Sequence, residues 1–321
     1  MKLTASNVIL FTHNDLDGIG GRIVFKEAFG RQAEVHSCGY HNVDQKIQDR
    51  LKELAFADVK PTIFIADLGI TKETADLLDE YTGDKVWLDH HKTNVELASN
   101  YDWATIDVDT SGTLLLYNFL EEEGFAVYRL RDFAIRVDDY DRWVHDYEES
   151  KQLNRLYFIL GEEMFEERCL GVLNPIKFSK SDNLLLRLEE KNIERYTSRV
   201  AKGMVVHSVK EMSIGIGFAD RFQSEVANDL LHEFELDAIA LIDINGQKIS
   251  MRSKAHFDVG SIAKELGGGG HKNAAGLEFD KIIDVRDCRV DMIAQLYANI
   301  RVAHNNAETR AIEAMFEGVV H

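Results

Sequence analysis

The chain has 321 residues with 55 acidic and 37 basic side chains, which gives a formal net charge of −18. This balance argues against binding to long duplex nucleic acid, because sequence-independent contacts to the phosphate backbone need clustered lysine and arginine. Hydrophobic residues make up 45% and charged residues 29%, as in an ordinary globular protein, and the length indicates two domains. No apolar run approaches the roughly 20 residues that span a bilayer, so we expect no membrane association.

The cysteines and the N-terminus indicate the cellular setting. Cys38, Cys169 and Cys288 are widely spaced and form no CxxC pair, which favours reduced and inert thiols. The first five residues lead directly into a strand pattern and contain no apolar core of a signal peptide. We therefore expect a cytoplasmic protein.

The first half of the chain alternates between strand and helix patterns. Strands are predicted at residues 8–12, 35–38, 62–66 and 85–88, and helices at residues 19–29, 43–56 and 71–78. Thr71 is the predicted N-cap of the third helix. This rhythm is typical of an α/β fold with a mostly parallel sheet and helices on both faces.

The second half is first helical and then rich in strands. Helices are predicted at residues 111–120, 130–137, 151–173 and 181–202, the last a long, highly charged amphipathic helix that could bridge two domains. Strands follow at residues 204–209, 212–218, 238–243, 248–253 and 274–279, and helices at 258–266 and from about residue 290. Asn245-Gly246 predicts a type I′ hairpin turn. The domain break is therefore placed near residue 203.

Three of the predicted strands end in polar side chains. Residues 8–12 run into His13-Asn14-Asp15-Leu16-Asp17, residues 62–66 into Asp67, and residues 85–88 into Asp89-His90-His91. Because open parallel sheets bind ligands outside the carboxyl ends of their strands, we expect these side chains to form one site.

Each of these motifs also has a plainer interpretation. In His13-x-Asp15-x-Asp17, alternate residues of an extended or tightly turned backbone can face one cluster, or the acids can cap the following helix. Asp67 can likewise be a ligand or a helix cap. The adjacent His90 and His91 are either two exposed loop histidines or one ligand and one residue that faces the substrate.

The ligand types favour divalent metal ions. A mixture of imidazole and carboxylate suits first-row divalent ions, and Asp89 could fix a histidine tautomer as a supporting partner. One acid of Asp138-Asp139-x-Asp141 could reach the same cluster, while the other two would be capping residues at the protein surface. Four crowded carboxylates would be partly protonated unless cations neutralised them. Two ions about 3.5–4 Å apart, bridged by a shared aspartate, are therefore more plausible than one.

A glycine run in the second half indicates a ligand-binding loop. Gly267 to Gly270 exceed what a helix C-cap requires, since one left-handed residue suffices. Backbone without side chains lets N–H groups approach a phosphate or a base, and His271 follows directly. A flexible glycine hinge is the alternative. Arg252, Lys254 and Lys272 could add positive charge.

These motifs together resemble a known superfamily. THNDLDG, IAD, LDHH and VDD look like the four motifs of the DHH phosphoesterases, and GGGGHKNAAG looks like the signature of their DHHA1 domain. The resemblance implies a DHH domain at residues 1–180, a linker helix at 181–203 and a smaller α/β DHHA1 domain at 204–321 with a helical tail. It also implies a dinuclear site, usually manganese, in the cleft between the domains.

The resemblance assigns a role to each candidate residue. His13 and Asp15 would bind the first metal. Asp17, His90 and Asp139 would bind the second, with Asp138 as the alternative to Asp139. Asp67 would bind both metals. His91 would face the phosphate, supported by Asp89. The substrate would contact Arg252, Gly268, Gly269, Gly270 and His271. The chain departs from branches such as family-II pyrophosphatases, which have His-x3-Asp-x-Asp where this chain has His-x-Asp-x-Asp.

THNDLDG and DDYDRW look closest to the bacterial nanoRNase/oligoribonuclease branch. This implies a phosphodiesterase with two Mn²⁺ ions, or Mg²⁺ or Co²⁺ in their place, that cleaves short oligonucleotides or a small nucleotide. Cyclic or linear dinucleotides and phosphoadenosine phosphate are alternative substrates, and pyrophosphate is disfavoured. A non-catalytic nucleotide sensor is the hypothesis from another class. The C-terminal tail would either dock on its own domain or form a homodimer.

Overall fold

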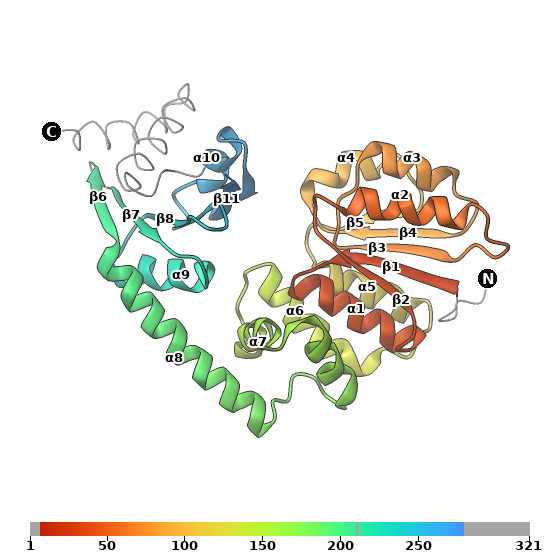
Figure 1. Ribbon diagram of the computed structural model, residues 1–321, viewed down its shortest axis with the longest axis horizontal. Helices are drawn as coiled ribbons and strands as arrows, with labels where there is room; N and C mark the ends of the chain where they lie inside the picture. The colour runs from red at the N-terminus through yellow and green to blue at the C-terminus, as the bar shows by residue number, and fades with distance from the viewer. Residues whose placement is uncertain (1–6, 210–211, 279–321) are drawn as a thin grey trace. The chain divides into compact units, whose positions relative to one another are not determined.

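The computed structural model describes residues 7–209 and 212–278 of the chain (Figure 1). The chain divides between Arg187 and Leu188 into two compact units, and helix α8 (Lys180–Gly203) crosses the division. The predicted helix from about residue 290 lies outside the described residues. None of the described helices combines the length and the apolar character that crossing a bilayer requires.

The first unit is built on a five-stranded parallel sheet. Its order is β2-β1-β3-β4-β5, and every neighbouring pair is parallel. The strands are β1 (Val8–His13), β2 (Glu34–Cys38), β3 (Thr62–Ala66), β4 (Lys85–Asp89) and β5 (Ala104–Ile106). The winding direction reverses between β1 and β3, and the carboxyl ends of the strands beside such a reversal are the usual place for a ligand.

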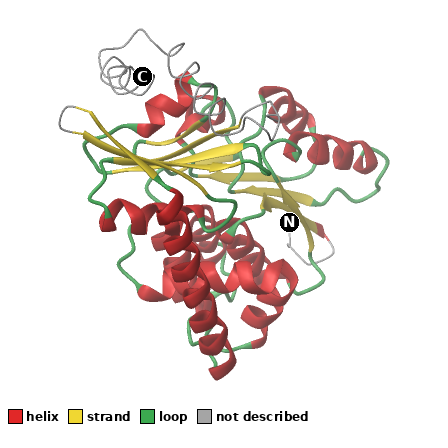
Figure 2. Ribbon diagram, turned by 60° about the vertical axis from the view of Figure 1, so that its left-hand side comes forward, coloured by secondary structure: helices red, strands yellow, loops and turns green. Residues whose placement is uncertain are grey.

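Helices cover both faces of this sheet because the side chains of its strands alternate. Leu10 belongs to the core on one face, whereas Ile9 and Phe11 belong to the core on the other. The first face is covered by α1 (Leu16–Phe29), α5 (Gly112–Glu122), α6 (Arg131–Asp141) and α7 (Glu148–Gly171). The second face is covered by α2 (Val43–Leu54), α3 (Lys72–Glu80) and α4 (Val95–Ala98) (Figure 1). Figure 2 draws these helices in red and the strands in yellow. The predicted α/β class is confirmed.

Local sequence explains most element ends in the first unit. Thr71 accepts a hydrogen bond from the Thr74 N–H and begins α3, as predicted. The predicted end of α6 was four residues too early, because the helix continues through the acidic segment to Asp141. The acids of VDDYD therefore lie in the last turn of a helix and not in a loop after it. The three-residue strand β5 was missed because it is too short to show a period.

The second unit contains a six-stranded mixed sheet. Its order is β10-β11-β9-β8-β7-β6, and only β7 and β8 run parallel. The strands are β6 (Val205–Val209), β7 (Met212–Phe218), β8 (Ala238–Asp243), β9 (Lys248–Ser253), β10 (Gly269–His271) and β11 (Ala274–Glu278). Helix α9 (Gln223–Glu233) makes the crossover that a parallel pair requires. Asp258 caps the helix α10 (Val259–Glu265), which was predicted at residues 258–266.

Two predictions for this unit were incomplete or wrong. Helix α9 was not predicted, although Val226, Ala227, Leu230 and Leu231 have helical spacing and are buried. The prediction of a type I′ turn at Asn245-Gly246 is wrong. Residues 244–247 form a longer connection in which the left-handed residue is Gln247, with φ of 51°. The Asp243 carboxylate accepts a hydrogen bond from the Gly246 N–H at 2.8 Å and holds this connection together.

Candidate active site

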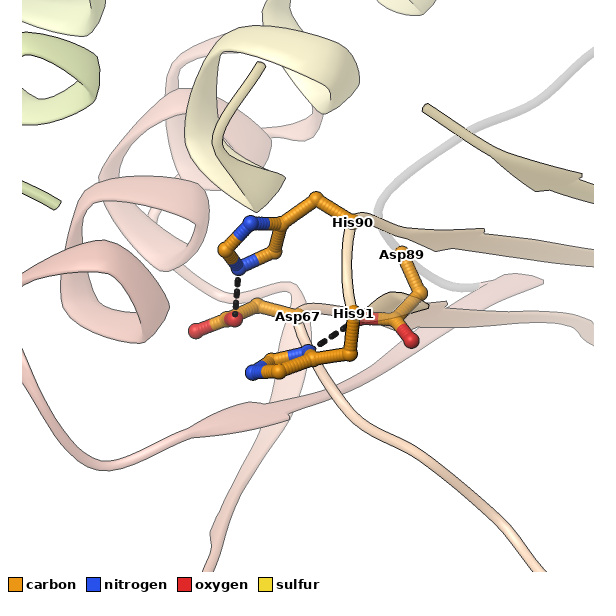
Figure 3. A group of neighbouring side chains, drawn as sticks. All are labelled: Asp67, Asp89, His90 and His91. Carbon is orange, nitrogen blue, oxygen red and sulfur yellow. Dashed lines mark hydrogen bonds and ion pairs between the residues drawn. The ribbon is translucent and has the colours of Figure 1, made fainter. Parts of the chain in front are cut away.

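The register of the first sheet brings the polar strand ends together. Thr12 pairs with Ala66 and Ala66 with Leu88, so the residues that follow β1, β3 and β4 leave the sheet side by side. Figure 3 shows Asp67 from β3 beside Asp89, His90 and His91 from β4. The convergence expected from the sequence is therefore present within the first unit.

Asp67 occupies an unusual backbone conformation at the end of β3. Its φ of 58° lies in the left-handed region, which Asp tolerates better than most residues but which still costs about 1 kcal/mol or more. Its N–H donates to the Leu88 carbonyl at 3.0 Å, so the strain does not break the sheet. A side chain at Gly112 would place its Cβ 2.5 Å from that of Asp67. The fold thus holds Asp67 tightly in a strained position.

A first group of metal-ligating side chains contains His13, Asp15 and Asp67. His13 Nδ1 lies 2.8 Å from Asp15 Oδ2 and 4.0 Å from Asp67 Oδ2. Asp67 Oδ2 is buried and has no hydrogen-bond partner among the described residues. Asp15 Oδ1 accepts from the Gly18 N–H and caps α1, so the capping and ligand interpretations both apply to Asp15 through different oxygens.

A second group contains Asp17, His90 and Asp141. His90 Nε2 lies 3.7 Å from Asp17 Oδ2 and 3.6 Å from Asp141 Oδ2. The same nitrogen lies 3.1 Å from Asp67 Oδ1. Asp67 therefore directs one oxygen toward each group, which is the arrangement of a bridging carboxylate.

The N-terminus of α5 fixes Asp17. The N–H groups of Gly112 and Thr113 donate to the two oxygens of this carboxylate at 2.6 and 2.9 Å. N–H groups of the first helical turn have no partner within the helix, and the helix dipole favours a negative charge there. Ser111 caps the same helix through its own hydroxyl. Asp17 is thus oriented before any ligand arrives.

His91 belongs to a separate chain of hydrogen bonds. Its Nδ1 lies 2.7 Å from Asp89 Oδ1, and the Asn94 amide donates to Asp89 Oδ2 at 2.6 Å. Burial lowers the pKa of His91, but the hydrogen bond and charge of Asp89 outweigh it and raise that pKa above its usual value. The Nε2 of His91 lies 3.1 Å from the Tyr40 hydroxyl. His90 and His91, though adjacent, therefore have different partners.

The buried carboxylates repel one another. Burial raises the pKa of Asp67 well above its usual range, and the charges of Asp17 and Asp15 raise it further. Burial and the same two neighbours also raise the pKa of Asp141. Carboxylates in this state bind protons or cations. Imidazole and carboxylate donors, with the buried Asp67 Oδ2 left without a hydrogen-bond partner among the described residues, fit divalent metal ions of the first transition row.

The structure does not bring Asp139 into either group. Its carboxylate accepts hydrogen bonds from the backbone N–H groups of Asp146 and Tyr147 at 2.8 and 3.3 Å. Asp138, the alternative, accepts from the Ser111 N–H at 2.7 Å. Asp141, and not Asp139, lies with Asp17 and His90. The physical reason is the longer α6, in which Asp139 points in a different direction from Asp141.

In the second unit, two of the predicted substrate contacts lie in one row of the sheet. Arg252 of β9 pairs with Ala274 of β11, which pairs with His271 of β10. Directly opposed residues point to the same face, so Arg252 and His271 flank the small Ala274 side chain. Arg252 also donates to the Ser224 hydroxyl at 2.8 Å, and His271 is exposed.

The structure shows which of the four consecutive glycines the fold itself requires. Gly267 has a φ of 83° after α10, and Gly270 has a φ of 134°. A Cβ at Gly268 would lie 2.2 Å from the Gly276 carbonyl oxygen, whereas a Cβ at Gly269 would meet nothing within 4 Å. The fold itself therefore requires three of the four glycines. The run contributes strand β10 to the sheet edge, and Gly269 is the one glycine of the four that the fold does not itself require.

Comparison with known proteins decides the family. Oligoribonuclease NrnB of Bacillus subtilis is 35% identical over 286 residues, which cover 83% of this chain and 71% of that protein. The chain belongs to the DHH/DHHA1 phosphoesterase family. The DHHA1 domain model matches residues 212–299. As a member of this family, the protein is a hydrolase that acts on phosphoester bonds.

Two further relatives of this phosphoesterase are more distant. A 3′,5′-cyclic-nucleotide phosphodiesterase of Helicobacter pylori is 22% identical over 349 residues, covering 90% of this chain and 98% of that protein. The crystal structure of exonuclease RecJ bound to manganese has a TM-score of 0.56 and 12% identity, covering 97% of this chain and 94% of that one. The RecJ structure confirms the fold.

Sequence reasoning missed several residues at this site. Tyr40, Asn94 and Gly112 all contact the predicted residues, whereas Asp141 was one of the three acids considered but was not the one chosen. Tyr40 had a usable signal, because it follows β2 at the same edge of the sheet. The role of Gly112 had no signal, since it arises from contact between α5 and β3.

Replacing Gly112 with alanine is expected to disturb both groups of ligands. The added Cβ would lie 2.5 Å from Asp67 Cβ and 3.0 Å from Asp17 Oδ2, so these carboxylates must move. We expect divalent metal affinity to fall about 10- to 100-fold, as for other supporting residues of metal sites. Titration calorimetry measures this, with Gly171→Ala, whose Cβ meets nothing within 4 Å, as the control. Wild-type affinity in Gly112→Ala would contradict the arrangement.

Asparagine substitutions separate Asp141 from Asp139. Asp141→Asn removes a charge that its neighbours repel, so we expect weaker metal binding and a higher free energy of unfolding for the metal-free protein. Asp139→Asn weakens hydrogen bonds from two backbone N–H groups and should cost about 1–3 kcal/mol of stability with little effect on metal affinity. Urea unfolding and metal titration measure both. The reverse pattern would restore Asp139 as the ligand.

Proposed function

We propose that this phosphoesterase is a two-metal phosphodiesterase that hydrolyses short oligoribonucleotides with Mn²⁺ as its ion. The division of Asp67 between the His13 and His90 groups is the main support, because one bridging carboxylate with ligands on both sides is suited to two ions. The 35% identity to an oligoribonuclease supports the substrate class.

The proposed ligands follow the two groups. His13 and Asp15 would hold the first ion. Asp17, His90 and Asp141 would hold the second, and Asp67 would contribute one oxygen to each. When bound, the ions supply a nucleophile by lowering the pKa of water and withdraw charge from the phosphate. The mixture of imidazole and carboxylate is suited to Mn²⁺, with Mg²⁺ and Co²⁺ as the other ions to compare.

The remaining polar residues act on the substrate. Asp89 fixes His91 through Nδ1, so that Nε2 is the nitrogen directed toward the phosphate. The raised pKa of His91 favours the protonated ring, which donates to a non-bridging oxygen and stabilises charge in the transition state. In the second unit, Arg252, Gly269 and His271 bind the substrate outside the scissile bond. With a net charge of −18, the protein selects short substrates that a few local cations can hold.

Hydrolysis of cyclic nucleotides is the second candidate function. It is favoured by the cyclic-nucleotide phosphodiesterase relative, which aligns with 90% of this chain. A non-catalytic sensor is disfavoured, because the described residues retain both groups of ligands around Asp67. Metal content separates these classes: about two Mn²⁺ per chain with turnover supports the enzyme, and tight nucleotide binding without turnover supports the sensor.

A panel of substrates tests the proposed function. With Mn²⁺, kcat/KM should be highest for di- to pentaribonucleotides, ahead of cyclic dinucleotides, 3′,5′-cyclic nucleotides, phosphoadenosine phosphate and pyrophosphate. Asp67→Asn keeps the shape and the left-handed backbone but should lose about 10³-fold or more of the activity, which excludes a contaminating nuclease. Preference for pyrophosphate, or most activity retained in Asp67→Asn, would overturn the proposal.

Two neighbouring glycines test the role of the second unit. Gly269→Ala has room for its methyl group, so stability should not change, but KM for a diribonucleotide should rise about 10-fold if substrate approaches this backbone. Gly268→Ala, which collides with the Gly276 carbonyl, should instead lower the stability of the second unit. Thermal unfolding and initial rates distinguish the two effects. An unchanged KM in Gly269→Ala would remove this glycine from the binding site.

A further inference from the structure

Tyr40 lies on the loop that connects β2 to α2, beside the ends of the central strands. Cys38 pairs with His13 in the sheet, so the chain leaves β2 next to His13, two residues before Tyr40. The loop is closed by a hydrogen bond from the Gly39 N–H to the Asn42 side chain at 3.0 Å. The fold therefore places Tyr40 at the site independently of the contacts of its own side chain.

The Tyr40 side chain contacts two histidines of the site. Its ring lies 4.5 Å from that of His13 between centroids, and its edge faces His91 at 5.9 Å. Its hydroxyl lies 3.1 Å from His91 Nε2. Yet Tyr40 is 56% exposed and belongs to neither hydrophobic core of the first unit. Its contacts therefore serve the site and not the packing of the fold.

The hydrogen-bond partners define the direction of the Tyr40 contact. Asp89 can only accept, so His91 Nδ1 carries a hydrogen. In a neutral His91, Nε2 then accepts from the Tyr40 hydroxyl, and in a protonated His91, Nε2 donates to the Tyr40 oxygen. A tyrosine hydroxyl is protonated at neutral pH, so it is able to donate.

We propose that Tyr40 positions the phosphate: its hydroxyl holds His91 Nε2 before substrate binds and then donates, beside His91, to a non-bridging oxygen of the scissile phosphate. The inference deepens the proposed function and rests on phosphodiester hydrolysis at this site. A phosphate that enters among carboxylates is repelled unless donors face it. The Tyr40 hydroxyl is a neutral donor that adds no charge to the ligand groups, and the ring keeps its place on His13.

A double-mutant cycle tests the coupling between Tyr40 and His91. Tyr40→Phe keeps the ring on His13 and removes only the hydroxyl. We expect kcat for a diribonucleotide to fall about 10- to 100-fold while KM changes about threefold at most, because the lost donor acts mainly in the transition state. In the His91→Ala background the same change should cost about twofold or less, since the two donors share one oxygen. Equal losses in both backgrounds would overturn the proposal.

Two controls exclude a purely structural role. Tyr81→Phe removes another tyrosine hydroxyl from the same unit, one that donates to the Pro61 carbonyl at 2.7 Å, and should leave kcat unchanged. Tyr40→Phe should keep wild-type metal affinity and thermal stability, whereas Tyr40→Ala should weaken metal binding because His13 loses its ring partner. A parallel fall of stability, metal affinity and kcat in Tyr40→Phe would overturn the proposal.

The cycle is run in parallel on bis(4-nitrophenyl) phosphate, a diester without ribose or base. Cleavage of this diester but not of short RNA would refute the proposed substrate class, and the cycle would still decide the role of Tyr40. If neither diester is cleaved, the proposed function fails. The affinity for AMP in the presence of Mg²⁺, measured by calorimetry, then tests whether Tyr40 contacts the phosphate. An affinity about tenfold weaker in Tyr40→Phe supports the contact to phosphate, and equal affinities overturn it.

Discussion

Repulsion among the buried carboxylates around Asp67 is the constraint on which the site depends. Asp67 is 2% exposed, and burial and the charges of Asp17 and Asp15 raise its pKa well above the usual range. A fold gains nothing in stability from such a cluster, and the left-handed backbone of Asp67 adds further strain. Divalent ions would neutralise the charge and give the buried Asp67 Oδ2 a partner, so metal binding accounts for the arrangement better than stability does.

The surrounding helices keep this cluster from rearranging. The first turn of α5 binds Asp17 through two N–H groups, and Asp138 of α6 holds the Ser111 N–H of the same turn. Asp139 ties down the chain that follows α6 through two more N–H groups. Asp138 and Asp139 therefore hold backbone N–H groups, whereas Asp141 of the same segment lies with Asp17 and His90 in the second group. This division explains why an acidic segment such as VDDYD contains both structural and ligand residues.

The sequence predicted the first sheet and the convergence of its strand ends because those signals are local. Apolar runs define β1, β3 and β4, and parallel strands bring their ends to one edge. The choice among Asp138, Asp139 and Asp141 required the true end of α6, and a helix end is set by tertiary contacts that no short window contains. Gly112 could not be found for the same reason. Helix α9, in contrast, had a helical pattern that was overlooked.

Adjacent histidines can take different roles here because they contact different carboxylates, although their rings lie only 4.4 Å apart between centroids. His90 Nε2 faces Asp67, while His91 Nδ1 faces Asp89 (Figure 3). The other ring nitrogen of His91 faces the Tyr40 hydroxyl. Asp89 is fully buried and is held by Asn94, so it fixes His91 without competing for an ion. If both histidines bound metal, the phosphate would lack the imidazole donor that Asp89 orients. In the proposed function, the boundary between metal site and phosphate site therefore lies within a single dipeptide, with Tyr40 on the phosphate side of it.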